Sequence, residues 1–210
     1  LAEDFTNYTI FSLWDTYRAL HPLFNLIRPT RSNDMIKSML AHYDQSVHKM
    51  LPIWSHYANE NWCMIGYHAT SIIAEAIVKE VGDFDREYAL LASANTAKVP
   101  YFDGLGEYIE YGYVPDENNA YSVSQTLEYA YDDWCIAQIA TAVGKHEIAG
   151  EFMQRSRNYK NVYNEKLGFM SPRLRDGEFR KNFDPMDTNG QGFIEGNAWN
   201  YGLYVPQDIE

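Results

Sequence analysis

The sequence predicts a mainly α-helical fold, and three observations lead to that prediction. Apolar residues recur at helical spacing in several separate segments. Glycine, proline and aspartate residues lie between those segments, where they end one helix or begin the next. No regular alternation of strand-like and helix-like segments is present, so a parallel sheet covered by helices is not expected.

The first predicted helices follow from two apolar stripes and one cap. After Pro29 the stripe is Met35, Ile36, Met39, Leu40 and Tyr43. The next stripe, which stops at Gly82, is Ile65, Ala69, Ile72, Ile73, Ala76 and Ile77. Asp85 is a favoured N-cap residue, so a third helix is expected to begin there and to run towards Pro100.

The middle of the chain continues the helical pattern. A short segment from Tyr108 to Tyr111 ends at Gly112, and a polar loop follows it. The longest predicted helix covers residues 124–143. It is closed by Gly144, in a position that favours glycine.

The pattern changes after the next predicted helix, which runs from His146 to about Asn164. Between residues 168 and 183, the pair Asp176-Gly177 is a strong tight-turn signal flanked by apolar residues. We therefore expect a small β-hairpin in residues 168–183.

Paired helices of similar length, with excursions at one end, indicate a toroid of helix pairs, part of an (α/α)6 barrel. A helical solenoid shows the same pattern and is the alternative. No residue signature repeats at a fixed period, which favours the toroid. With 210 residues the chain is long enough for one sizeable core, so residues 1–210 are expected to form a single helical domain.

Charge and aromatic content limit the classes of partner. The formal net charge of -12 argues against nucleic acid or an anionic membrane, because both require a basic surface. The chain has 17 Tyr, 10 Phe and 5 Trp, and such rings suit the apolar faces and hydroxyls of sugars, although large helical cores also use many tyrosines. No apolar run is long enough to cross a bilayer.

Cys63 and Cys135 lie far apart in the sequence, each in an apolar context. We expect two buried free thiols, and a single disulfide is the alternative in an oxidising compartment. Their spacing resembles no zinc or redox motif, so the cysteines do not decide the compartment.

Glu195 is the strongest candidate for chemistry, in the segment Glu195 to Trp199. Glycoside hydrolysis needs a carboxylic acid that keeps its proton near neutral pH and gives it to the leaving oxygen. Apolar neighbours, here Phe193, Ile194 and Trp199, favour that protonated form. If the segment opens a helix, Glu195 and Trp199 share one face of it. The alternative is a first-turn glutamate that interacts favourably with the helix dipole.

A second cluster, from Trp14 to Pro22, places a ring, a carboxylate, a guanidinium and an imidazole in one short stretch. Asp15 and Arg18 are spaced to pair on a helix. In the functional interpretation Asp15 accepts hydrogen bonds from vicinal sugar hydroxyls, Trp14 lines the same pocket, and Arg18 holds the carboxylate ionised and oriented. Otherwise Asp15 is a first-turn residue that simply pairs with Arg18.

Polar residues also precede an apolar helix in the stretch Asn59 to His68. Glu60 is expected at the mouth of that helix, where it is a candidate for binding sugar. His68 lies beside alanine, and a lone histidine in such a place is more often a hydrogen-bonded core residue than a ligand or base. We therefore expect His68 to be a buried residue that supports the side chains of the site without contacting the sugar.

Glu128 and Asp132 lie four residues apart on the longest predicted helix, and Asp133 follows. Like charges at that spacing repel unless a cation, an arginine or a shared proton offsets them. A solvated acidic stripe is one interpretation. The interleaved aromatic residues favour the other, in which these carboxylates belong to a pocket wall or support it.

Four of these stretches together resemble one family, glycoside hydrolase family 92, the calcium-dependent exo-acting α-mannosidases. The resemblance runs, in order, through residues 11–22 (Phe-Ser-Leu-Trp-Asp-Thr-Tyr-Arg-Ala-Leu-His-Pro), 63–69 (Cys-Met-Ile-Gly-Tyr-His-Ala), 126–137 and 195–201. It therefore covers nearly the whole chain, with motifs far longer than a lone glycine fingerprint.

The resemblance implies an inverting hydrolysis of terminal α-linked mannose, expected to be α-1,2-linked. Glu195 matches the family's general acid, and Trp14 and Asp15 match positions that shape the mannose pocket. Arg18, Glu60, Asn197 and Trp199 are further substrate-binding candidates, and Glu128, Asp132, Asp133 and His68 are expected to support them. The general base is expected beyond Glu210, so this chain by itself is expected to be inactive.

The resemblance also implies one Ca²⁺ that contacts the sugar, with most ligands expected outside this chain. Many members have Gln where this chain has Asn200, which makes Asn200 a weak metal candidate. We expect the chain to be part of a larger multidomain enzyme, completed by an N-terminal β-sandwich and C-terminal helices on which it packs.

The expected substrate is a mannose-containing oligosaccharide, and the expected compartment is periplasmic or secreted. Two alternatives remain from the sequence. One is a glycosidase of other sugar specificity on the same fold, and the other is a non-catalytic helical carbohydrate-binding module.

Overall fold

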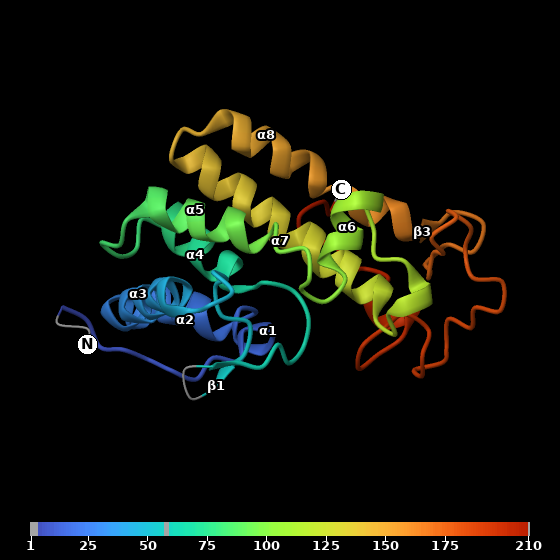
Figure 1. Cartoon of the computed structure of the whole chain (residues 1–210), viewed down its shortest axis with the longest axis horizontal. Coiled ribbons are helices and arrows are strands. Elements are labelled where there is room, and N and C mark those ends of the chain that lie inside the picture. Colours follow the sequence, from blue (N-terminus) through green and yellow to red (C-terminus); the bar gives the residue numbers. More distant parts are fainter. Residues whose placement is uncertain (1–3, 57–58, 210) are drawn as a thin grey trace. The chain divides into compact units, whose positions relative to one another are not determined.

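The computed structural model describes residues 4–56 and 59–209 and is mainly helical, as predicted (Figure 1). The chain divides into two compact units. The first comprises Leu1–Ala97 and Asp132–Phe152, and the second comprises Lys98–Tyr131 and Met153–Glu210. The boundary falls inside two helices, α7 (Ser122–Ala142) and α8 (His146–Arg155), so each contributes residues to both units. A single domain over residues 1–210 stays a prediction.

The first unit is built mostly from helices that pack on one another. α2 contacts α3 and α4, and α5 contacts both α3 and α4. A short antiparallel hairpin pairs Ser55 with Glu60. The elements are α1 (Leu13–Thr16), α2 (Leu20–Ile27), α3 (Pro29–Gln45), β1 (Ser55–His56), β2 (Asn59–Glu60), α4 (Ala69–Val78) and α5 (Arg86–Thr96), followed by the end of α7 and most of α8.

The second unit has shorter elements and more loop. β3 and β4 form an antiparallel hairpin in which Tyr163 lies opposite Met170, and α9 packs against β4. The elements are α6 (Leu105–Tyr111), η1 (Asp116–Asn118), the start of α7, the end of α8, η2 (Asn158–Val162), β3 (Tyr163–Asn164), β4 (Phe169–Met170) and α9 (Ala198–Tyr201).

Several helix ends lie where the sequence predicts them. Asp85 caps α5 by accepting the N–H of Tyr88 at 2.9 Å. α6 ends at Gly112, whose φ of 75° is the left-handed conformation that glycine adopts without strain. α7 covers nearly the predicted range and is followed by Gly144 at φ 74°.

Two helices are shorter than predicted. α4 begins at Ala69 rather than near Ile65, because the preceding segment turns through left-handed backbone at Trp62, Met64 and Gly66. α8 ends at Arg155 instead of Asn164, since residues 158–162 form a 3-10 helix and the chain then enters β3.

The hairpin prediction is confirmed in kind and displaced in position. Strand β3 precedes residues 168–183, whereas β4 lies at the start of that range, and the turn between the two strands contains Gly168 with a φ of 72°. The turn at Asp176-Gly177 is present, with Gly177 N–H bonded to the carbonyl of Leu174 at 2.9 Å. It carries an isolated bridge between Arg173 and Phe179 rather than two paired strands.

Both cysteines are free thiols. Cys135 is buried in α7, as expected, but Cys63 is exposed. The expected burial of Cys63 is wrong because this residue lies in the irregular segment before α4, where its N–H is held by Asn61 at 2.9 Å. In the part of the chain that the structure describes, no helix is both long and apolar enough to span a membrane.

His21 in α2 makes the stability of the first unit depend on pH. The side chain is 2% exposed, and its Nδ1 has no hydrogen-bond partner among the described atoms. Burial lowers the pKa of His21 from 6.5 to about 4, so the folded protein holds it neutral at pH 7. Below pH 6.5 the unfolded chain binds a proton that the folded chain resists, and stability is lost as the pH falls.

We expect acidification from about pH 7.5 to about pH 5 to lower the free energy of unfolding by about 2 kcal/mol through the protonation of His21. Unfolding by urea as a function of pH measures the loss. His21→Phe removes the titrating group and should flatten this pH dependence, whereas His146→Gln, at an exposed position, should leave it unchanged. An equally steep loss in His21→Phe would contradict the assignment.

Candidate active site

The first group of predicted site residues lies on and just after α1. Asp15 is exposed, and its carboxylate accepts a hydrogen bond from the Ser12 hydroxyl. Arg18 lies beyond Thr16, where α1 ends, and its guanidinium lies over the rings of Trp14 and Tyr17, 4.8 and 4.7 Å from their centroids. Asp15 and Arg18 do not lie on one helix, because α1 ends at Thr16, and their pairing stays a prediction.

His68 is buried and held by contacts on two sides. Its ring stacks on that of Tyr17, with centroids 4.1 Å apart and 9° between the planes. Its Nδ1 lies 2.9 Å from Asp132 Oδ1, and Asp132 Oδ2 accepts the N–H of Tyr67 at 2.6 Å. Asp133 accepts the Tyr67 hydroxyl at 2.7 Å. These contacts place His68, Asp132 and Asp133 in one buried cluster, and their supporting role at a sugar site stays a prediction.

Gly66 makes room for the His68 ring. Its φ is 80°, and a Cβ at this position would lie 2.5 Å from His68 Nε2. In this motif Gly66 leaves space for the His68 ring, and the Tyr67 N–H binds Asp132, the carboxylate that contacts His68.

The carboxylate of Glu60 on β2 accepts hydrogen bonds from backbone N–H groups. Its Oε1 accepts the N–H groups of Trp54, Asn61 and Trp62 at 2.7–3.0 Å, and its Oε2 accepts the N–H of Ile53 at 2.6 Å. A carboxylate has about four acceptor positions, and backbone groups occupy them here. The prediction that Glu60 lies at the mouth of a helix is wrong. Glu60 is in strand β2 of the hairpin, and the next helix, α4, begins only at Ala69.

Glu195 in the second unit stands on strained backbone. Its φ of 49° is left-handed, which is uncommon for a residue other than glycine and typical of functional sites. The side chain is exposed, while Phe193 and Ile194 before it are buried. The apolar shelter expected from these two residues is therefore not provided to Glu195 within the described part of the chain.

The residues after Glu195 cap a short helix. Asn197 accepts the N–H groups of Trp199 and Asn200 at 3.1 and 3.3 Å, and Asn200 Oδ1 accepts the Asn197 N–H at 3.0 Å. α9 begins only at Ala198, so Glu195 precedes the helix instead of sharing a helical face with Trp199. Trp199 is 63% exposed and packs edge-on against Phe169, with centroids 5.0 Å apart.

Glu128 on α7 is fully buried and accepts the Tyr204 hydroxyl at 2.6 Å. Two contacts that the sequence did not reveal lie nearby in the chain. Ser124 Oγ accepts the N–H of Ile194 at 3.1 Å, and the Tyr201 hydroxyl donates to the Ile194 carbonyl at 3.0 Å. Ser124 and Tyr201 fall inside or beside the motifs, but no residue pattern predicts that they meet Ile194.

The calcium prediction finds no complete site here. Among residues 4–56 and 59–209, no three His, Cys, Asp or Glu side chains are grouped so as to hold a metal ion. Asn200, the weak candidate, already uses its side-chain oxygen in the helix cap. The binding of Ca²⁺ by the complete protein stays a prediction.

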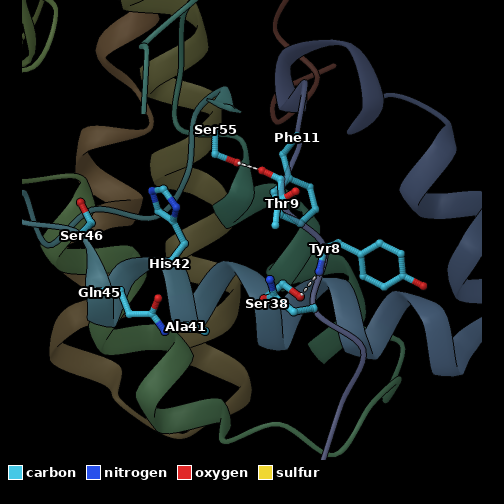
Figure 2. A pocket seen from close by; sticks show the side chains of 10 residues that line it. Tyr8, Thr9, Phe11, Ser38, Ala41, His42, Gln45, Ser46 and Ser55 are labelled. Carbon is cyan, nitrogen blue, oxygen red and sulfur yellow. Dashed lines mark hydrogen bonds between the residues drawn. The ribbon is translucent and has the colours of Figure 1, made fainter. Parts of the chain in front are cut away.

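A small polar hollow lies between the N-terminal segment and α3, with a volume of about 60 Å³ (Figure 2). Ser55 Oγ donates to the Thr9 carbonyl, and Ser38 Oγ accepts the Tyr8 N–H, on the wall of this hollow. None of the predicted site residues lines it. The hollow is thus separate from the candidate active site.

The predicted site residues form two groups, one in each unit. Trp14, Asp15, Arg18, Glu60, His68, Asp132 and Asp133 belong to the first unit, and Glu128, Glu195, Asn197, Trp199 and Asn200 belong to the second. Within the first group, ring and hydrogen-bond contacts join α1 to His68 and Asp132. Within the second group, Ile194 bonds to the hydroxyls of Ser124 on α7 and Tyr201 on α9, and Asn197 caps α9.

Two of the solved structures with similar folds are those of bacterial mannosidases. A family 92 α-mannosidase from Bacteroides thetaiotaomicron is 53% identical over 99% of this chain, with a TM-score of 0.95. A family 92 inverting mannosidase from the same species is 34% identical over 96% of this chain, with a TM-score of 0.89. This chain covers 28% of each of those chains. The likeness confirms the expected fold class, a mainly helical part of the family's α/α barrel.

A curated relative and a match to a family model agree with the similarity to these mannosidase structures. A protein described as an uncharacterized secreted glycosidase, from Arthroderma benhamiae, is 27% identical over 69% of this chain, and the match spans 23% of that protein. Residues 1–210 match the catalytic domain of glycosyl hydrolase family 92. The chain therefore belongs to glycoside hydrolase family 92.

Proposed function

We propose that the complete protein to which this chain belongs hydrolyses terminal α-linked mannose from oligosaccharides or glycans. The observation that carries the proposal is Glu195, an exposed carboxyl on left-handed backbone in the motif that resembles the family's general acid. The similar bacterial proteins are α-mannosidases, one of them in complex with mannoimidazole and another described as inverting.

Glu195 is proposed to protonate the leaving oxygen while a separate carboxylate activates water on the opposite face of the sugar. In inverting enzymes the two carboxyls stand about 6.5–9.5 Å apart, which leaves room for that water. The base is proposed to lie outside this chain. Trp199 offers an exposed ring for the apolar face of a sugar, and Asp15 offers an exposed carboxylate for sugar hydroxyls.

Three further parts of the proposal rest on the resemblance and the comparisons. A preference for α-1,2-linked mannose and a dependence on Ca²⁺ come from the resemblance alone. Secretion is supported by the fungal relative, which is described as secreted, whereas a periplasmic location rests on the expected substrate class alone.

The acid role of Glu195 predicts a loss that depends on the leaving group. Glu195→Gln cannot give a proton, so hydrolysis of α-1,2-mannobiose, a poor leaving group, should fall by about 10²–10⁴-fold. Hydrolysis of dinitrophenyl α-mannoside, whose leaving group needs no proton, should change little. Steady-state rates of the complete protein on both substrates measure this.

Glu110→Gln is the matched control, because it removes one negative charge at an exposed position of α6 in the same unit. It should leave both rates unchanged. Equal rates for Glu195→Gln and the wild type on mannobiose would contradict the acid role. Mannobiose bound and recovered intact by the wild type would favour a binding module instead.

The calcium proposal predicts that a chelator stops mannose release and that added Ca²⁺ restores it. Oxygen-rich sites prefer Ca²⁺ when they are large and flexible, whereas Mg²⁺ demands tighter octahedral geometry. Mg²⁺ added after chelation should therefore restore little. Full activity in the chelator, in a protein shown to be folded, would remove calcium from the proposal.

A further inference from the structure

Both backbone polar groups of Ile194, the residue before Glu195, are hydrogen-bonded to side-chain hydroxyls. Ile194 N–H donates to Ser124 Oγ at 3.1 Å, and the Ile194 carbonyl accepts the Tyr201 hydroxyl at 3.0 Å. The Ile194 carbonyl belongs to the same peptide plane as the Glu195 N–H. The two hydroxyls thus fix the two peptide planes that lead into Glu195.

The approach of this segment to α7 is close and specific. The Gly192 carbonyl accepts the N–H groups of Val123 and Ser124, at 2.9 and 3.1 Å, at the first turn of α7. Gly192 has a φ of 85°, and a Cβ there would lie 2.8 Å from Val123 Cγ2. Three hydrogen bonds from the start of α7 therefore hold residues 192–194.

The left-handed conformation of Glu195 needs such support. A residue other than glycine is strained in this region, and the conformation persists only where its surroundings over-determine it. Ser124 is fully buried and Tyr201 is 8% exposed, so water does not compete strongly for their hydroxyls. Loss of either hydroxyl would release a peptide plane that directs the Glu195 side chain.

We propose that Ser124, together with Tyr201, is a positioning residue that aims the Glu195 carboxyl at the leaving oxygen. The inference rests on the proposed function, because it takes Glu195 to be the general acid. Proton transfer requires the acid within hydrogen-bond reach of the leaving oxygen, and a misplacement of about 1 Å can cost about 10²-fold in rate. Neither hydroxyl touches the sugar in this role.

The test is Ser124→Ala in the complete protein, assayed on α-1,2-mannobiose and on dinitrophenyl α-mannoside. A misaimed acid should lower kcat on mannobiose by about tenfold or more and leave the dinitrophenyl substrate within about threefold. Tyr201→Phe, which removes only the second hydroxyl and keeps the ring, should show the same selective loss. It keeps the proposal testable if Ser124→Ala folds poorly.

Thr126→Val is the matched control. Thr126 is also fully buried on α7, and its hydroxyl accepts a backbone N–H, that of Val114, at 2.9 Å. This variant loses the same kind of bond at a segment that does not lead to Glu195. It should lower the unfolding temperature by a similar amount without changing the ratio of the two rates.

Glu195→Gln in the same assay separates the two hypotheses. If it shows the selective loss while Ser124→Ala and Tyr201→Phe lower both rates equally or neither, the positioning role is wrong and the proposed function stands. If Glu195→Gln shows no selective loss, Glu195 is not the acid, and both are overturned.

Discussion

Burial of three carboxylates on α7 is the constraint on which both groups of site residues depend. Glu128, Asp132 and Asp133 are fully buried, so each must be compensated by hydrogen bonds or charge inside the protein. Tyr67 supplies its N–H and its hydroxyl to the two aspartates, and Tyr204 supplies its hydroxyl to Glu128. The interpretation of these residues as a solvated acidic stripe is therefore wrong.

Each compensating contact also fixes a segment that bears site residues. In the first unit, Asp132 contacts His68, whose ring stacks on Tyr17, the residue before Arg18. In the second unit, Tyr204 follows α9 and lies three residues beyond Tyr201. A hydrogen bond to a buried charged group typically contributes about 1.5–3 kcal/mol, so these contacts hold the segments in place. The folding requirement and the positioning of the site are met by the same residues.

The sequence predicts the helices well where periodicity and caps agree, as at α3, α5 and α7. It fails where a local pattern is overruled by backbone geometry, as at the start of α4, where Met64 and Gly66 adopt left-handed conformations. The candidate site residues were predicted from motifs, but the motifs did not predict which groups these residues contact. Which backbone groups Glu60 and Asn197 bind depends on how the chain turns around them, and no spacing in the sequence encodes this.

The exposure of Glu195 bears on how a general acid could work here. A carboxylic acid keeps its proton near neutral pH only where its charged form is disfavoured, and full hydration favours that form. Phe193 and Ile194 are buried whereas Glu195 is exposed, so these two residues do not form the apolar surroundings that the sequence predicts for it. The peptide planes before Glu195 are held by hydrogen bonds between Ile194 and the hydroxyls of Ser124 and Tyr201. In the proposed acid role, the contribution of these residues is to fix the backbone that carries the Glu195 side chain.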